Sequence, residues 1–173
     1  MKTKNIIYYG IVFLLVIVAK AAYTFASNDT LVFILKPLSQ IISVITNADF
    51  IYSGAAGFYF ETLNITIDKS CSGINFWCIS FLVFMLLLLK FCKSHLQKIL
   101  LFPVVIFVTY GLTLFANSSR ILTSIFIAKQ THFNYSWLHQ AEGVFIYLSF
   151  LMLSYTLLNR SLSKFNSHHE KLT

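Results

Sequence analysis

Three side chains in this 173-residue sequence have the chemistry that acyl transfer requires: Cys71, Arg120 and His139. A cysteine thiolate is a nucleophile, and a histidine can accept its proton and return it to a leaving group. The planar guanidinium of an arginine suits a carboxylate or a developing oxyanion. The three residues lie far apart in the sequence, so they form a site only if the elements that carry them converge.

The composition indicates what those elements are. Hydrophobic residues make up 57% of the chain and charged residues only 11%, with a mean hydropathy of +0.74. A soluble domain carries about 25% charged residues, so a soluble enzyme and a disordered chain are both excluded. The sequence therefore predicts an all-α membrane protein, with residues 1–173 forming a single multipass domain.

Four stretches are apolar over about the 20 residues that a membrane-spanning helix needs. They are residues 6–26, 73–89, 99–116 with a pattern that extends to 128, and 143–159. The first stretch could instead be a cleaved signal peptide, but its apolar run continues past Lys20 and is long for a signal core, so we expect it to be retained.

Residues 31–45 form a fifth apolar stretch, which Lys36 and Pro37 interrupt. Each side of this interruption is too short to span, so we expect a short helix at the membrane interface, with a fifth span as the alternative. Between residues 50 and 69, apolar and polar residues alternate, which predicts a small extracytoplasmic β-hairpin that turns near residues 61–63. This hairpin leads the chain to Cys71.

The charges predict which way the spans face. Basic residues precede the first span, fill the loop between the second and third spans and follow the fourth, whereas five of the six acidic residues fall in the other loops. Basic loops stay in the cytoplasm, so we expect both termini there and residues 27–72 and 129–142 outside. This topology places Cys71, Arg120 and His139 at one face of the cytoplasmic membrane. The net charge of +7 is therefore topological, and we expect no nucleic-acid partner.

Each of the three residues has an alternative interpretation. Cys71 could be a packing residue, but it precedes a helix whose N-terminus favours a thiolate, with Lys69 nearby. Arg120 could reach back to the interface, but apolar residues continue beyond it. His139 could be a solvated loop residue, and His132 competes with it for the same role. Glu142 could orient His139 or serve as an acid in the first turn of a helix.

The other cysteines distinguish Cys71 further. Cys78 lies about 10.5 Å further along the same predicted helix, too far for a disulfide, and Cys92 is on the predicted cytoplasmic side. Cys71 is thus the only thiol predicted outside. No Gly-rich phosphate loop and no zinc-ligand spacing occurs in the sequence, so we expect no cofactor and no metal.

Cys-Ser-Gly-Ile at 71–74, Asn-Ser-Ser-Arg at 117–120 and His139 with Gly143 resemble the exosortase and archaeosortase family, and the run at 69–76 is most similar to exosortase K. The resemblance covers roughly residues 31–143. It implies that Cys71 is the nucleophile, Arg120 the stabiliser of the oxyanion or of a substrate carboxylate, and His139 the proton carrier. Ser72, Asn117 and Glu142 are the candidate supporting residues.

The resemblance also implies a function. The family cuts a C-terminal sorting tail, which consists of a short motif, a membrane helix and a basic end, from secreted proteins and passes the acyl group to an acceptor. The expected partners are such tails, membrane lipid and an acceptor nucleophile that the sequence does not identify. The chain has room for fewer spans than the family's larger members, which raises the expectation of a homo-oligomer.

Three other functions remain as alternatives. A non-catalytic membrane scaffold or assembly factor would tolerate Cys71→Ser, Arg120→Lys and His139→Ala. A transporter or channel subunit would need polar residues within its spans, and the middles of the second and fourth spans contain little beyond Cys78, Ser80 and Ser149. A serine protease is disfavoured because Ser53 lacks the Gly-x-Ser-x-Gly spacing of a nucleophile elbow.

Overall fold

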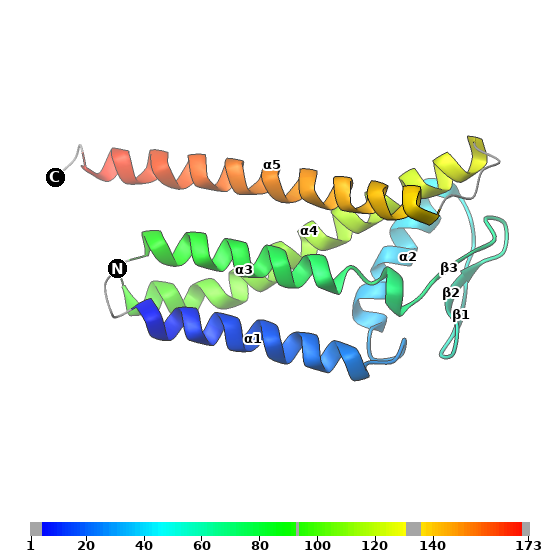
Figure 1. Cartoon of the computed structure of the whole chain (residues 1–173), viewed down its shortest axis with the longest axis horizontal. Helices are drawn as coiled ribbons and strands as arrows, with labels where there is room; N and C mark the ends of the chain where they lie inside the picture. The colour runs from blue at the N-terminus through cyan, green and yellow to red at the C-terminus, as the bar shows by residue number, and fades with distance from the viewer. Residues whose placement is uncertain (1–4, 93, 131–135, 171–173) are drawn as a thin grey trace.

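The computed structural model describes residues 5–92, 94–130 and 136–170 of the chain. Within these ranges the long helices α1 (Ile6–Phe25), α3 (Ile74–Phe91), α4 (His95–Gln130) and α5 (Ser136–Glu170) lie along one elongated bundle (Figure 1). Each contains an apolar window long enough to cross a membrane. The prediction of an all-α multipass membrane protein with four spans is confirmed.

The helices are longer than the predicted spans. The predicted third span and its extension form one continuous 36-residue helix, which Pro103 does not end. The fourth predicted span, 143–159, is the middle of the 35-residue α5. Apolar length marks only the part of a helix that lies in lipid, whereas the hydrogen-bonded backbone continues into the polar segments on either side.

A three-stranded antiparallel sheet lies at one end of the bundle, which we call the sheet end (Figure 1). Its strands are β1 (Ile51–Ser53), β2 (Gly57–Phe60) and β3 (Ile65–Ile67), in the order β1-β2-β3. Strands β2 and β3 are the predicted hairpin, and their alternating pattern buries Phe58, Phe60 and Ile67. Strand β1 was not predicted, and residues 54–56 form the turn that joins it to β2.

Gly57 is required where β2 begins. Its φ of +96° lies in the region that side chains disfavour, and an added Cβ would lie 2.5 Å from the carbonyl oxygen of Ile67. The Ile67 carbonyl therefore points towards β2, which fixes the direction of the peptide groups along β3.

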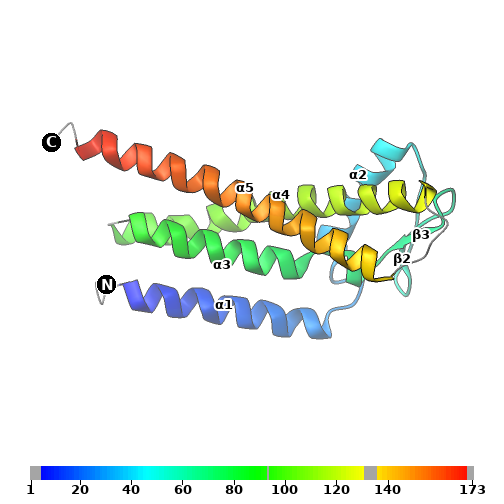
Figure 2. The same cartoon turned by 45° about the horizontal axis from the view of Figure 1, so that its top comes forward.

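Helix α2 (Val32–Thr46) crosses the bundle close to the sheet end (Figures 1 and 2). With 15 residues it is too short to span a membrane, so the prediction of a short, non-spanning helix is confirmed. Its buried face, which consists of Ile34, Leu35, Leu38 and Ile42, packs in the same core as Phe58, Phe60 and Ile67 of the sheet.

The prediction that Lys36 and Pro37 divide this stretch is wrong, because α2 continues through both. A proline has no N–H group, so the carbonyl four residues earlier, that of Phe33, loses its helical partner. The hydroxyl of Tyr110 in α4 donates a hydrogen bond to this carbonyl at 2.6 Å. This bond from a neighbouring helix satisfies the acceptor that the proline leaves open, and α2 remains intact.

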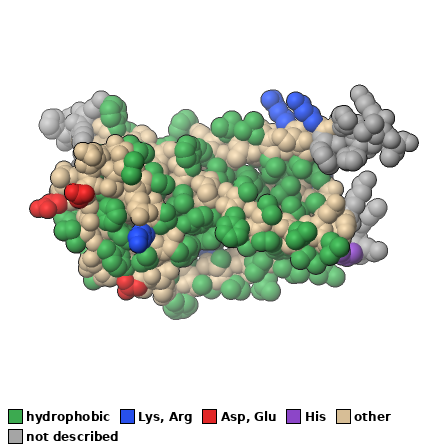
Figure 3. Space-filling view, turned by 180° about the vertical axis from the view of Figure 1, so that it is seen from behind, with side chains coloured by type: hydrophobic (Ala, Val, Ile, Leu, Met, Phe, Trp, Pro, Cys, Tyr) green, Lys and Arg blue, Asp and Glu red, His purple; other side chains and the backbone are tan. Residues whose placement is uncertain are grey.

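The two ends of the bundle differ in charge. Helix α1 begins and α5 ends at the end opposite the sheet (Figure 1). On the face in Figure 3, hydrophobic side chains cover the middle, acidic side chains lie at the sheet end, and basic side chains lie mainly at the opposite end. This distribution suits a protein whose apolar middle contacts lipid.

We predict that Tyr110→Phe destabilises the protein by about 1 kcal/mol, because it leaves the Phe33 carbonyl without a donor. Unfolding of the purified chain in mixed detergent micelles measures this change. In a Pro37→Ala background, the backbone at position 37 regains the missing N–H, so the same Tyr110→Phe substitution should have little effect. Equal penalties in the two backgrounds would show that the hydroxyl does not act on the Phe33 carbonyl.

Candidate active site

Cys71 ends the short 3-10 helix η2 (Lys69–Cys71), which joins β3 to α3 at the sheet end. The Asp68 side chain begins this turn by accepting hydrogen bonds from the Ser70 N–H at 3.0 Å and from the Ser70 hydroxyl at 2.6 Å. The Asp68 carbonyl accepts the Cys71 N–H at 2.9 Å. The backbone of the half-buried Cys71 is thus held by a hydrogen-bonded turn rather than by a flexible loop.

Lys69 anchors this turn to α1. Its ammonium donates to the carbonyls of Thr24 at 3.0 Å and Ala26 at 2.8 Å, at the C-terminal end of α1. Tyr23 donates its hydroxyl proton to the Lys69 carbonyl at 3.0 Å. The Lys69 ammonium, which the sequence suggested as a neighbour that favours the thiolate, therefore has a structural role at a helix end, where cations are favourable.

Cys71 and Arg120 line the same cavity, which has a volume of about 350 Å³. It lies between β3 and the part of α4 nearest the sheet. Most of the remaining lining is apolar, and it consists of Ile65, Thr66, Ile67, Ile121, Ser124, Ile125 and Ala128. The Cys71 sulfur lies 4.0 Å from the Thr66 carbonyl oxygen and 3.8 Å from the Ser70 hydroxyl. A thiol and a guanidinium, the predicted nucleophile and anion stabiliser, thus face one space.

Asn117 joins the turn that carries Cys71 to the helix that carries Arg120. Its buried side-chain NH2 group donates to the carbonyl of Cys71, and its side-chain oxygen accepts the Tyr147 hydroxyl at 2.6 Å. The prediction of Asn117 as a supporting residue thus has a concrete contact behind it, since the amide touches the backbone of Cys71 itself.

Tyr147 of α5 completes this network. Its hydroxyl accepts a hydrogen bond from Arg120 at 3.2 Å, and the guanidinium lies 5.7 Å from the centre of its ring. Its ring stacks on that of Phe76 in α3, with 4.7 Å between the centroids. Sequence reasoning missed Tyr147. The available signal was its position four residues after Gly143, on the same face of a predicted helix.

Two glycines allow these elements to approach closely. Gly73, which precedes α3, has a φ of +72°, and an added Cβ would lie 3.1 Å from both the Asn117 side-chain nitrogen and the Thr113 methyl group. In α5, a Cβ on Gly143 would lie 3.2 Å from the Arg120 Cδ atom. Each glycine removes a side chain at the point where a neighbour of the candidate site must fit.

His139 lies in the first turn of α5, but its side chain is outside the described part of the chain. His132, the competing histidine, is also outside it. Position 139 lies one helical turn before Gly143 and two turns before Tyr147, the residues of α5 that contact Arg120. The backbone of His139 lies about 6 Å from that of Gly143 along the helix axis, towards the N-terminus of α5. Glu142 is half-buried beside Gly143.

Ser72, the remaining candidate supporting residue, is buried, and its hydroxyl has no hydrogen-bond partner among the described residues. Its N–H donates to the Lys69 carbonyl at 3.1 Å, which continues the turn. The role that these contacts support is packing. No three histidine, cysteine or carboxylate side chains come together as a metal site among the residues that the structure describes.

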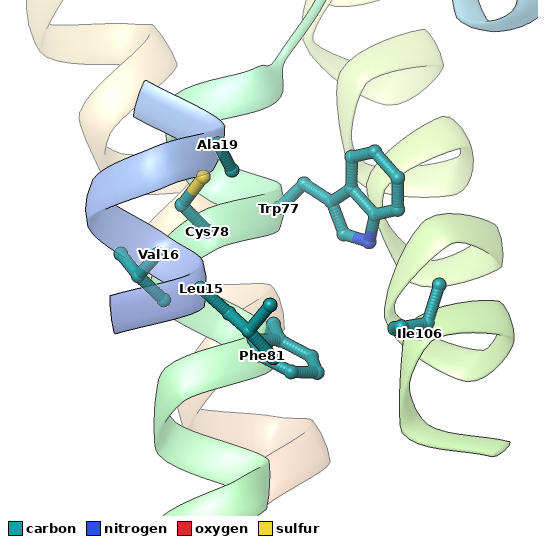
Figure 4. A pocket seen from close by; sticks show the side chains of 7 residues that line it. All are labelled: Leu15, Val16, Ala19, Trp77, Cys78, Phe81 and Ile106. Carbon is teal, nitrogen blue, oxygen red and sulfur yellow. The ribbon is translucent and has the colours of Figure 1, made fainter. Parts of the chain in front are cut away.

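The other two cysteines lie in different surroundings. Cys78 lines an apolar cavity of about 180 Å³ between α1, α3 and α4 (Figure 4). Figure 4 shows its sulfur near Val16 and Ala19, and the side chains that line this cavity are apolar or aromatic. Cys92 follows α3 at the opposite end, where burial raises the pKa of its thiol. Cys71 thus lines a cavity together with an arginine, whereas the cavity that Cys78 lines contains no charged side chain among its described residues.

Comparison with known proteins identifies the family. The family described as "Transmembrane exosortase" matches residues 6–156, from the start of α1 into α5, a range that includes Cys71, Arg120 and His139. No curated protein and no solved structure matches the chain. Because the family match covers most of its length, the protein belongs to the transmembrane exosortase family, a family of membrane cysteine peptidases and transpeptidases.

Proposed function

We propose that this protein is a cysteine transpeptidase or protease that removes a C-terminal sorting tail from secreted proteins through an acyl-enzyme on Cys71. The observation that carries the proposal is the cavity that Cys71 and Arg120 share, in a chain of the exosortase family. The sequence of residues 69–76 favours exosortase K as the subtype. The substrate is a secreted polypeptide that ends in a short motif, a membrane helix and a basic segment.

The proposed reaction has two steps. The Cys71 thiolate attacks the scissile carbonyl carbon, a C–S bond forms, and the carbonyl electron pair moves to the oxygen, where the Arg120 guanidinium stabilises it. The intermediate then collapses, the C–N bond breaks, and His139 protonates the departing amine of the tail. An acceptor nucleophile or water then attacks the resulting thioester and gives its proton to His139, the new acyl bond forms, the C–S bond breaks, and the thiolate is restored.

The position of the cavity suits this substrate. Cys71 directly precedes α3, so it lies where a spanning helix begins. When the membrane helix of the substrate tail lies in the bilayer beside the protein, the substrate residues that precede this helix lie at the same depth as Cys71. The acidic loops are at this end and the basic segments at the other, which supports cytoplasmic termini and a cavity that faces outside the cytoplasmic membrane.

We predict that Cys71→Ala abolishes tail removal, because no other thiol lines the cavity among the residues that the structure describes. Arg120→Lys should lower the rate by about 100- to 1,000-fold, since it keeps the charge but loses the fork that stabilises the oxyanion. The measurement is cleavage of a co-expressed secreted reporter that carries a tail from the same genome. Cys78→Ala is the matched control, because it removes a thiol from the apolar cavity and should leave cleavage unchanged.

The non-catalytic scaffold makes the opposite prediction for this experiment. A scaffold would leave reporter cleavage independent of Cys71 and tolerant of Arg120→Lys. Continued cleavage in Cys71→Ala, with the protein present at normal levels, would therefore overturn the proposed chemistry.

We predict that a membrane-impermeant maleimide added to intact cells modifies Cys71 and leaves Cys92 unmodified. Cys92 lies at the opposite end of α3, and its raised pKa keeps less of this thiol ionised at neutral pH even after the membrane is opened. Mass spectrometry of the labelled peptides distinguishes the two sites. Modification of Cys92 in intact cells would reverse the proposed topology.

We predict that Tyr147→Phe lowers the cleavage rate by about 10- to 100-fold, as expected for the loss of a hydrogen bond to a charged group. The ring that stacks on Phe76 is retained, but the buried Asn117 side-chain oxygen loses its donor, so we also expect a loss of stability of about 1–3 kcal/mol. Tyr155→Phe is the matched control in the same helix, because Tyr155 is exposed on the apolar surface. Equal cleavage rates in the two variants would show that Tyr147 does not position Arg120.

A further inference from the structure

Strand β3 is an edge strand of the sheet, and this edge borders the cavity that contains Cys71. We propose that the substrate residues just before the scissile bond bind as an additional strand along the free edge of β3, which pairs with no strand other than β2 in the described part of the chain. This inference rests on the proposed function, because it takes Cys71 as the nucleophile. It assigns the peptide-binding subsite of the enzyme to main-chain groups of Thr66.

The register of the sheet identifies which groups of β3 are available. Ile67 pairs with Phe58, Thr66 with Tyr59 and Ile65 with Phe60. The Ile67 carbonyl points towards β2, where it lies against Gly57. Peptide groups alternate in direction along an antiparallel strand, so the N–H and the carbonyl of Thr66 point away from β2. Thr66 therefore offers one donor and one acceptor at the free edge.

The position of Cys71 agrees with this direction. Its sulfur lies 4.0 Å from the Thr66 carbonyl oxygen, on the side of β3 that faces the cavity. A peptide that pairs with Thr66 would lie about 4.8 Å from β3, the normal spacing between paired strands. This spacing places the backbone of the bound peptide within reach of the Cys71 sulfur, which is what attack on a peptide carbonyl requires.

The opposite wall of the cavity limits what fits beside β3. It is formed by α4, where Arg120 provides the positive charge and Ile121 and Ile125 provide apolar surface. An extended polypeptide has unpaired N–H and carbonyl groups that match an edge strand, whereas a membrane helix has already satisfied its own. The occupant is therefore the extended segment that precedes the tail helix, with small or apolar side chains.

The test compares two thiol-reactive peptide probes on the purified full-length protein in detergent. One is acetyl-trialanyl chloromethyl ketone, and the other is the same compound with its amide nitrogens methylated. Both alkylate a thiolate with loss of chloride, but only the first can pair with a strand edge. We expect the first probe to modify Cys71 about tenfold faster, as the one or two main-chain hydrogen bonds that Thr66 can make would produce.

Two substitutions at one position assign the effect to the strand. Thr66→Pro removes the outward N–H and is compatible with an edge strand, so the unmethylated probe loses one of its two hydrogen bonds and its advantage over the methylated probe should shrink. Thr66→Ala keeps the N–H and should keep the preference. Iodoacetamide, which has no peptide backbone, should modify Cys71 equally in all three proteins, which shows that the site itself is intact.

Equal rates for the two probes in the wild-type protein would overturn the inference, and so would a preference that Thr66→Pro leaves undiminished. The wild-type comparison remains decisive even if the proline variant does not fold. The proposed function fails by a different result, namely reporter cleavage that continues in Cys71→Ala, so the two failures are distinguishable.

Discussion

The side-chain amide of Asn117 connects the three elements of the candidate site. Its nitrogen donates to the Cys71 carbonyl before α3, its oxygen accepts from Tyr147 in α5, and its own backbone belongs to α4. A buried polar group without a partner costs about 1–3 kcal/mol, and the bilayer core supplies no water to replace one. Both ends of the amide are hydrogen-bonded at once, and lipid offers no groups that compete for these bonds. The bonds therefore help to set the distance between Cys71 and Arg120.

A second set of polar contacts holds the sheet and the Cys71 turn against α1. The Asn28 side chain donates to the carbonyls of Gly54 and Ala55 in the β1–β2 turn and accepts the N–H of Lys69. The Lys69 ammonium binds two carbonyls at the end of α1. Helix α1 lines no part of the shared cavity, yet these contacts make it the support from which β3 and η2 are positioned.

The sequence predicts the spans and the hairpin because both depend on local patterns, namely apolar length and a two-residue alternation. It does not predict β1, whose exposed residues Ile51–Ser53 carry no buried face. It also does not predict that α2 continues through Pro37, because the compensating donor, Tyr110, comes from a residue far along the chain. Patterns within one segment do not report hydrogen bonds between distant segments.

The same distinction applies to the site. Charge counts predict that Cys71 and Arg120 lie at one end of the bundle, but they specify only a level along the helices. Whether these residues also approach one another across the bundle depends on Gly73 and Gly143. The absence of a side chain at Gly73 makes room for Asn117, and its absence at Gly143 makes room for Arg120. A lone glycine in a sequence has many uses, so its role as a point of close approach becomes visible only when the neighbouring helix is in place.

The size of the chain can now be related to its site. Helix α1 and the spanning part of α5 bury only 6% of their apolar windows, so both leave most of their surface to lipid. Four spans nevertheless suffice to bring Cys71 and Arg120 to one cavity, because β3, α4 and the turn before α3 line it within one chain. A second copy is therefore not required to bring Cys71 to Arg120. If the predicted homo-oligomer forms, its interface is therefore not what brings these two groups together.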